Sequence, residues 1–258
     1  MWLPIVVIVV LFFLIAPVFV LIPLSFTSLT YFKFPPPGFS TQWYRAFFDN
    51  SQWMECFGRS IEISILTVIL SLVIGTMAAA AVTRIEFKYK EIFMAFMVMP
   101  MVIPVIIISI ALYNAFSPLR LTDTIQGIVL AHTLLSIPMV FVTVMTGLKG
   151  VDRNIELAAM GLGSRYIGVF FHITLPQIKA SMLSAAIFAF STSIDEVTVT
   201  MFIAGANTKT LPVAMWESMR NNIAPDIAAV STILIGITLL MLGIQGIMKS
   251  RVAKIKQN

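Results

Sequence analysis

Long stretches of this sequence contain no charged residue. Five of them, without Asp, Glu, Lys or Arg, cover residues 1–32, 63–83, 92–119, 124–148 and 227–248, and a sixth, 180–208, is interrupted only by Asp195 and Glu196. A helix that crosses a bilayer needs about 20 predominantly apolar residues. The composition agrees, because 59% of the 258 residues are hydrophobic and only 11% are charged, whereas about a quarter of a soluble domain is charged. The sequence therefore predicts an all-α membrane protein.

The predicted architecture is a single transmembrane domain over residues 1–258. Its six transmembrane helices are expected at about 3–25, 61–83, 92–116, 125–147, 180–203 and 227–248. The connection between the fourth and fifth spans, residues 149–179, is long, since two to eight residues are enough to join neighbouring helices of a bundle. Its apolar residues and glycines predict two short helices with a break between them, and a structured segment of this kind indicates a partner.

The positive charges lie between the apolar stretches. The net charge is +5, but the basic residues do not form one patch, so no nucleic-acid partner is expected. One side of the predicted topology carries 11 of the 17 Lys and Arg residues. They are Arg84, Lys88, Lys90, Lys149, Arg153, Arg165, Lys179, Lys249, Arg251, Lys254 and Lys256. Because cytoplasmic loops are enriched in Lys and Arg, both termini and residues 149–179 are predicted to be cytoplasmic, and residues 26–60 to face outward.

Asp195 and Glu196 lie inside the predicted fifth span. A charged side chain at the centre of a transmembrane helix costs about 2.5–3.5 kcal/mol on insertion scales, and such residues usually face a cavity or a partner. No Lys or Arg lies inside a predicted span, so no salt bridge between spans is expected. Two alternatives stay open: a carboxylate holds spans together by hydrogen bonds, or the pair presents negative charge to a cationic substrate. Ser193 and Thr192 are predicted to share that substrate pathway.

The 149–179 connection contains a motif with defined spacing. Its residues are Ala158, Ala159, Gly163, Ile173, Leu175 and Pro176. They match the pattern E-A-A-x3-G-x9-I-x-L-P, which marks the permease subunits of binding-protein-dependent ABC importers, and the chain resembles these permeases along nearly its whole length. The stretch SIDEVTVTMFIAGANTKTLP is similar to the fifth-span region of polyamine-type permeases, the second permease of spermidine/putrescine systems.

This resemblance implies a type I ABC importer permease fold, a location in the bacterial inner membrane and no catalytic residue in this chain. The implied partners are a second permease subunit, two copies of a cytoplasmic ATPase subunit and an extracytoplasmic substrate-binding protein, besides the membrane lipid. ATP and Mg are expected on the ATPase, because this sequence has no G-x4-G-K-[ST] phosphate-binding loop. The implied substrate is a small cation such as spermidine or putrescine. His132 and His172 are not expected to form a metal site.

The residues expected to couple this chain to the ATPase are Glu156, Leu157, Ala158, Ala159 and Gly163. A short helix can place apolar side chains at helical spacing into a groove on a partner, and Ile155, Ala159 and Leu162 have this spacing. The alternative is a helix that packs only on its own bundle. The chain departs from the motif at Leu157, where the family has a glutamate, and Glu156 is expected to keep part of that role.

Other functions are consistent with six spans and two buried acids. A permease of the same kind could carry another small solute, such as iron, thiamine or an opine-like compound. A secondary transporter could couple its substrate to protons through such acids, although it needs no docking segment for an ATPase. An intramembrane enzyme is disfavoured, because no Ser–His, metal-ligand or Asp-pair arrangement occurs on separate predicted spans.

The predicted topology can be tested with single cysteines. In a variant that lacks Cys56, a cysteine at position 209 should react with a membrane-impermeant thiol reagent in intact cells. Cysteines at positions 90 and 254 should react only after the membrane is opened, because the basic flanks keep these positions in the cytoplasm. Labelling of position 254 in intact cells would overturn the orientation.

Overall fold

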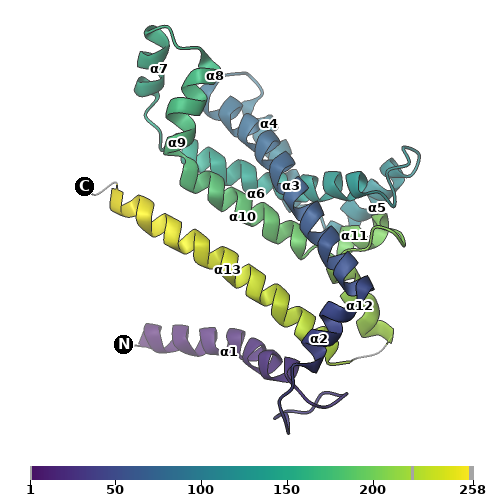
Figure 1. The fold of residues 1–258 in the computed structure, drawn as a ribbon. Coiled ribbons are helices and arrows are strands. Elements are labelled where there is room, and N and C mark those ends of the chain that lie inside the picture. Colours follow the sequence, from purple (N-terminus) through teal and green to yellow (C-terminus); the bar gives the residue numbers. More distant parts are fainter. Residues whose placement is uncertain (1, 222–223, 256–258) are drawn as a thin grey trace. The chain divides into compact units, whose positions relative to one another are not determined.

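A computed structural model describes residues 2–221 and 224–255, and all of its regular elements are helices apart from one isolated bridge between Thr27 and Phe39. The chain divides into two compact units, residues 1–58 with 211–240 and residues 59–210 with 241–258. The boundaries fall inside α3 (Ser51–Arg84) and α13 (Asp226–Ile255). Figure 1 gives the order of the elements along the chain.

The first unit contains α1 (Trp2–Ser25), α2 (Gln42–Asp49), α12 (Leu211–Asn221) and the first parts of α3 and α13. The loop after α1 folds back on α2, because the indole Nε1 of Trp43 donates a hydrogen bond to the carbonyl of Thr27 at 2.9 Å. A small core of this unit joins Phe47, Cys56, Leu211, Ala214 and Val230.

The second unit holds the remaining helices. They are α4 (Lys90–Val98), the 3₁₀ turn η1 (Met99–Met101), α5 (Val105–Phe116), α6 (Ile125–Lys149), α7 (Arg153–Gly161), α8 (Tyr166–Val169), the π-helical turn η2 (Phe170–Thr174), α9 (Leu175–Gln177), α10 (Lys179–Ile194) and α11 (Thr198–Ile203). Helices α6 and α10 run side by side and form the centre of the unit (Figure 1).

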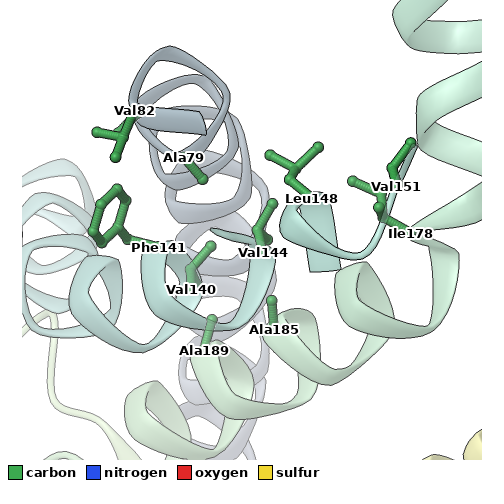
Figure 2. Packing of buried hydrophobic residues seen from close by; sticks show 11 residues of the cluster. Ala79, Val82, Val140, Phe141, Val144, Leu148, Val151, Ile178, Ala185 and Ala189 are labelled. Carbon is green, nitrogen blue, oxygen red and sulfur yellow. The ribbon is translucent and has the colours of Figure 1, made fainter. Parts of the chain in front are cut away.

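The main core of the second unit lies where α3, α6 and α10 meet (Figure 2). Ala79 comes from α3, Val140 and Val144 come from α6, and Ala185 and Ala189 come from α10; all five are fully buried. Small residues let transmembrane helices approach closely, which increases van der Waals contact where lipid gives no hydrophobic drive to associate. The alanines on α3 and α10 therefore explain why the larger side chains of α6 fit between these helices.

Four described helices are long and apolar enough to cross a membrane: Trp2–Ser25, Ser51–Arg84, Ile125–Lys149 and Asp226–Ile247. Two bent pairs raise the number to six if each is one span: Lys90–Met101 with Val105–Phe116, bent by 99°, and Tyr166–Gln177 with Lys179–Ile194, bent by 80°. The first bend falls at residues 102–104. Pro104 lacks an N–H and disfavours helical backbone at Ile103, so the sequence itself ends the helix there.

The stretch expected as one continuous fifth span, 180–203, is divided in the structure. Helix α10 ends at Ile194, α11 begins at Thr198, and residues 195–197 form a break between them. The predicted second span is also longer than expected, since α3 begins at Ser51.

A group of hydrogen bonds around Asp123 connects two loops of the second unit near α11. Asp123 has a positive φ of 54°, and its Oδ1 accepts hydrogen bonds from the Gly205 N–H at 3.0 Å and from the Thr208 hydroxyl at 2.7 Å. Its own N–H donates to the carbonyl of Ile203 at 2.8 Å. Asp123 therefore joins the loop before α6 to the loop after α11. A Cβ on Gly205 would overlap the Asp123 carboxyl group, so this contact requires a glycine.

Replacing Gly205 by alanine should destabilise the second unit by about 1–3 kcal/mol, because an overpacked contact must open and the hydrogen bonds to Asp123 are lost with it. Thermal unfolding in detergent measures the effect. Gly58→Ala is the matched control: a Cβ there meets nothing within 4 Å, and alanine favours the helix. Equal melting temperatures for wild type and Gly205→Ala would contradict the requirement for a glycine at position 205.

Candidate functional site

The two carboxylates at the break in the fifth span differ in exposure and in hydrogen bonding. Asp195 follows the last turn of α10 and is exposed, whereas Glu196 is partly buried. Glu196 Oε1 accepts a hydrogen bond from the N–H of Val199 at 2.6 Å. The first N–H groups of a helix have no partner within the helix and attract negative charge, so Glu196 caps α11 while Asp195 remains available.

A histidine from α6 holds the two sides of this break together. His132 is fully buried; its Nδ1 lies 2.8 Å from the Ser193 hydroxyl on α10, and its Nε2 lies 2.8 Å from the Thr200 hydroxyl on α11. The Thr200 hydroxyl also donates to the carbonyl of Glu196 at 3.3 Å. A neutral imidazole has one donor and one acceptor nitrogen. Since Thr200 donates to Glu196, the arrangement favours a proton on Nε2 and a hydrogen bond from Ser193 to Nδ1.

Sequence reasoning missed this role of His132. The pattern that points to it is the spacing of Ser193 and Thr200, seven residues apart on one side of the fifth span, because a buried imidazole needs polar partners. The structure also changes the setting of Ser193, which is 4% exposed and faces His132. Thr192 is partly exposed. A pathway role for Ser193 and Thr192 stays a prediction.

Neither carboxylate of the break has a basic partner among the described residues. Arg84 and Lys90, for example, form salt bridges with Glu156 and Glu86 and not with the acids of the break. Exposed carboxylates without a fixed cation can accept hydrogen bonds from an ammonium group. The break is therefore a candidate site for a cationic ligand.

The second candidate site is the connecting segment, residues 149–179. Helix α7 begins after Asp152, whose Oδ1 accepts a hydrogen bond from the N–H of Asn154 at 2.9 Å, a regular N-cap. It ends in a Schellman motif, because the Gly163 N–H donates to the Met160 carbonyl and the Ser164 N–H to the Ala159 carbonyl. Gly163 has a φ of +91°, which residues with a Cβ rarely adopt.

Helix α7 exposes apolar side chains on more than one of its sides. Ile155 and Leu157 are about half exposed and Leu162 is 89% exposed, while Ala158 is exposed and Ala159 is partly buried. Large apolar side chains continue along the segment at Tyr166, Ile167 and Phe171, all exposed. Large exposed apolar patches mark interaction sites, and this concentration of exposed apolar side chains makes the segment a candidate docking site.

Glu156 is not among the exposed residues of α7. It is 5% exposed, and its Oε2 lies 2.8 Å from the Nε of Arg84 at the end of α3. The Thr174 hydroxyl donates a hydrogen bond to the other carboxylate oxygen, Glu156 Oε1, at 2.6 Å. The carboxylate that was expected to take part of the role of the motif glutamate is therefore engaged within this chain, and Leu157 is the exposed residue of the two.

Residues 71–254 match the family described as "Binding-protein-dependent transport system inner membrane component". The chain belongs to this family. It is 31% identical over 234 residues to the putrescine transport system permease protein PotI of Escherichia coli K12, covering 87% of this chain and 82% of PotI. It is 27% identical over 229 residues to the spermidine/putrescine transport system permease protein PotC of the same strain, covering 89% and 86%.

The fold agrees with this family. The structure resembles a chain of the bacterial alginate ABC transporter, solved in complex with an alginate pentasaccharide-bound periplasmic protein, with a TM-score of 0.72 and 15% identity over 98% of this chain and 96% of that one. The predicted all-α, type I ABC importer permease fold is thus confirmed. The chain is a multi-pass membrane protein and a transport subunit, and its membership of the binding-protein-dependent family excludes the secondary transporter and the intramembrane enzyme.

The end of α7 gives a prediction. Gly163→Val should weaken association of the ATPase subunit or substrate-stimulated ATP hydrolysis, because a β-branched residue resists the positive φ and opens the Schellman motif. The strain costs about 1–3 kcal/mol, and membrane insertion should be normal. Co-purification and ATP hydrolysis in detergent measure both effects.

The matched control is Gly161→Val, two residues earlier. A Cβ on Gly161 meets nothing within 4 Å, and its φ is not positive, so this variant should retain assembly. Normal assembly and normal stimulated hydrolysis in Gly163→Val would count against a docking role for this turn.

Proposed function

We propose that this chain is a permease subunit of an ATP-driven importer and that, with a second permease, it forms the pathway for a small cationic substrate of the polyamine class. The observation that carries the proposal is the break in the fifth span, where Asp195 and Glu196 have no basic partner among the described residues. The names of PotI and PotC, which refer to putrescine and spermidine/putrescine transport, support the same substrate class. Another small solute, such as iron, thiamine or an opine-like compound, is the alternative substrate.

The two carboxylates would have different roles in binding the substrate. Asp195 is exposed and its side chain can meet an ammonium group directly, through a charge-assisted hydrogen bond. Glu196 has one oxygen committed to the Val199 N–H, so it contributes charge to the pathway while it fixes the start of α11. An ammonium group in the pathway would thus meet negative charge at a place that α10 and α11 hold in a defined geometry.

The energy would come from partners of this chain. We assign ATP and Mg to two copies of a cytoplasmic ATPase subunit, which would dock on the exposed apolar side chains of α7 and of the turn after it, Ile155, Leu157 and Leu162. An extracytoplasmic binding protein would deliver the substrate to the outer face. The open groove beside α2, lined by residues that include Phe39 and Arg45, is a candidate surface for it. In this topology both termini are cytoplasmic and the membrane is the bacterial inner membrane.

Asp195→Asn and Glu196→Gln should each lower polyamine uptake with little loss of assembled complex. The neutral isosteres keep most hydrogen bonding, including an acceptor for the Val199 N–H, but remove the charge. At an effective dielectric constant near 20, a charge pair about 4 Å apart is worth roughly 4 kcal/mol, and about 1.4 kcal/mol changes an equilibrium constant tenfold. Uptake into proteoliposomes should fall roughly tenfold or more, and the loss should be larger for a triamine than for a diamine.

Glu91→Gln is the control for this experiment. Glu91 is an exposed acid in the first turn of α4, and its neutralisation should leave uptake unchanged. If the double variant Asp195→Asn, Glu196→Gln transports at the wild-type rate with a normal yield of complex, the carboxylates are structural and the cationic-substrate proposal loses its support.

A further inference from the structure

The ion pair between Arg84 and Glu156 connects four elements of the second unit. Arg84 is the last residue of α3 and Glu156 lies on α7, 72 residues later. Nε of Arg84 lies 2.8 Å from Glu156 Oε2, and Nη2 of Arg84 donates to Glu156 Oε1 at 3.0 Å. The same Nη2 donates to the carbonyl of Leu148, in the last turn of α6, at 3.1 Å. Thr174, at the end of η2, completes the group by its bond to Glu156.

Helix α7 contacts both the main chain and the side chain of Arg84. Nη2 of Arg153, the first residue of α7, donates to the carbonyl of Arg84 at 3.1 Å. Glu156 binds the guanidinium one turn further on. Two residues of α7, Arg153 and Glu156, therefore bind the same residue of α3. A displacement of α7 must either move the end of α3 or break these contacts.

The setting of the pair is unlike that of a surface salt bridge. The side chains of Arg84 and Glu156 are only 10% and 7% exposed. Loss of one partner in such a site leaves the other charge buried without compensation, which is far more costly than loss of a solvated pair. The guanidinium also lies at the C-terminal end of α6, where a positive charge is favoured by the helix dipole. An arginine fits this site because its planar fork donates in several directions at once, whereas a lysine is a single point charge.

We propose that the Arg84–Glu156 pair is the mechanical link that passes displacement of α7 to the ends of α3 and α6. The inference rests on the proposed function, because α7 moves usefully only if an ATPase docks on its exposed apolar side chains. Arg84 and Glu156 are then positioning residues: they contact neither ATP nor substrate, and they decide how much of the motion of α7 reaches the spanning helices. The residues for docking and for transmission differ in burial, because Leu157 is about half exposed and Glu156 is buried.

The test uses the whole transporter complex in proteoliposomes and measures three quantities: the ATPase that co-purifies, the rate of ATP hydrolysis, and the substrate taken up per ATP hydrolysed. Glu156→Gln, Arg84→Gln and Arg84→Lys should each retain the ATPase. The uptake per ATP should fall about tenfold in the two glutamine variants and less in Arg84→Lys, which keeps the charge. The exchange Arg84→Glu with Glu156→Arg should recover part of the ratio, since the pair is restored in the opposite order.

Glu86→Gln is the matched control. It breaks the salt bridge between Lys90 and Glu86, at 2.9 Å, in which the glutamate side chain is 83% exposed. This variant removes a charge pair from the loop that follows Arg84 but not from the link, so the uptake per ATP should equal that of the wild type.

A wild-type ratio in assembled Glu156→Gln and Arg84→Gln complexes would overturn the proposal. So would parallel loss of ATPase, hydrolysis and uptake with no recovery in the exchange variant, because that pattern belongs to a purely structural pair. If no ATPase co-purifies with the wild-type chain, the proposed function fails instead. Hydrogen exchange then still tests the link, which requires that Arg84→Gln raises exchange of the α7 amides while Glu86→Gln does not.

Discussion

The hydrogen bonds of His132 support the break in the fifth span, and the candidate pathway depends on that break. Backbone polar groups inside a membrane must find partners within the protein, so an interrupted helix persists only where neighbouring groups satisfy it. His132 binds the hydroxyl of Ser193 before the break and that of Thr200 after it, and Glu196 accepts the N–H of Val199. These contacts let residues 195–197 leave the helix without separating α10 from α11.

The acids of this chain illustrate two ways in which a membrane protein uses a carboxylate. Glu156 is buried and faces a guanidinium, and its Oε1 accepts hydrogen bonds from Arg84 and Thr174. Asp195 is exposed and has no cation of its own among the described residues. The first arrangement fixes two helices to each other, and the second keeps a charge available to something outside the chain. The difference lies in the surroundings and not in the residue type.

The sequence was sufficient for the coarse fold, because charge-free stretches of spanning length and basic flanks are properties of the chain itself. It also identified the turn at Gly163, where a glycine ends α7 with a positive φ. It was not sufficient for the division of the fifth span, since the partner that stabilises the break, His132, lies on α6 and is brought there only by tertiary packing. The direction of Glu156 was missed for a similar reason: its partner, Arg84, is 72 residues away, and helical spacing alone does not say which side of a short helix meets the bundle.

Asp123 and Gly205 have a consequence for the history of this protein. The carboxyl group of one occupies the space that a side chain on the other would need, although the two positions are 82 residues apart. The constraint acts in one direction: a side chain at 205 needs the space that the acid at 123 occupies, whereas a glycine at 205 is compatible with other residues at 123. In any lineage the loss of the acid should therefore precede a side chain at 205, and relatives with a side chain at 205 should lack the acid at 123.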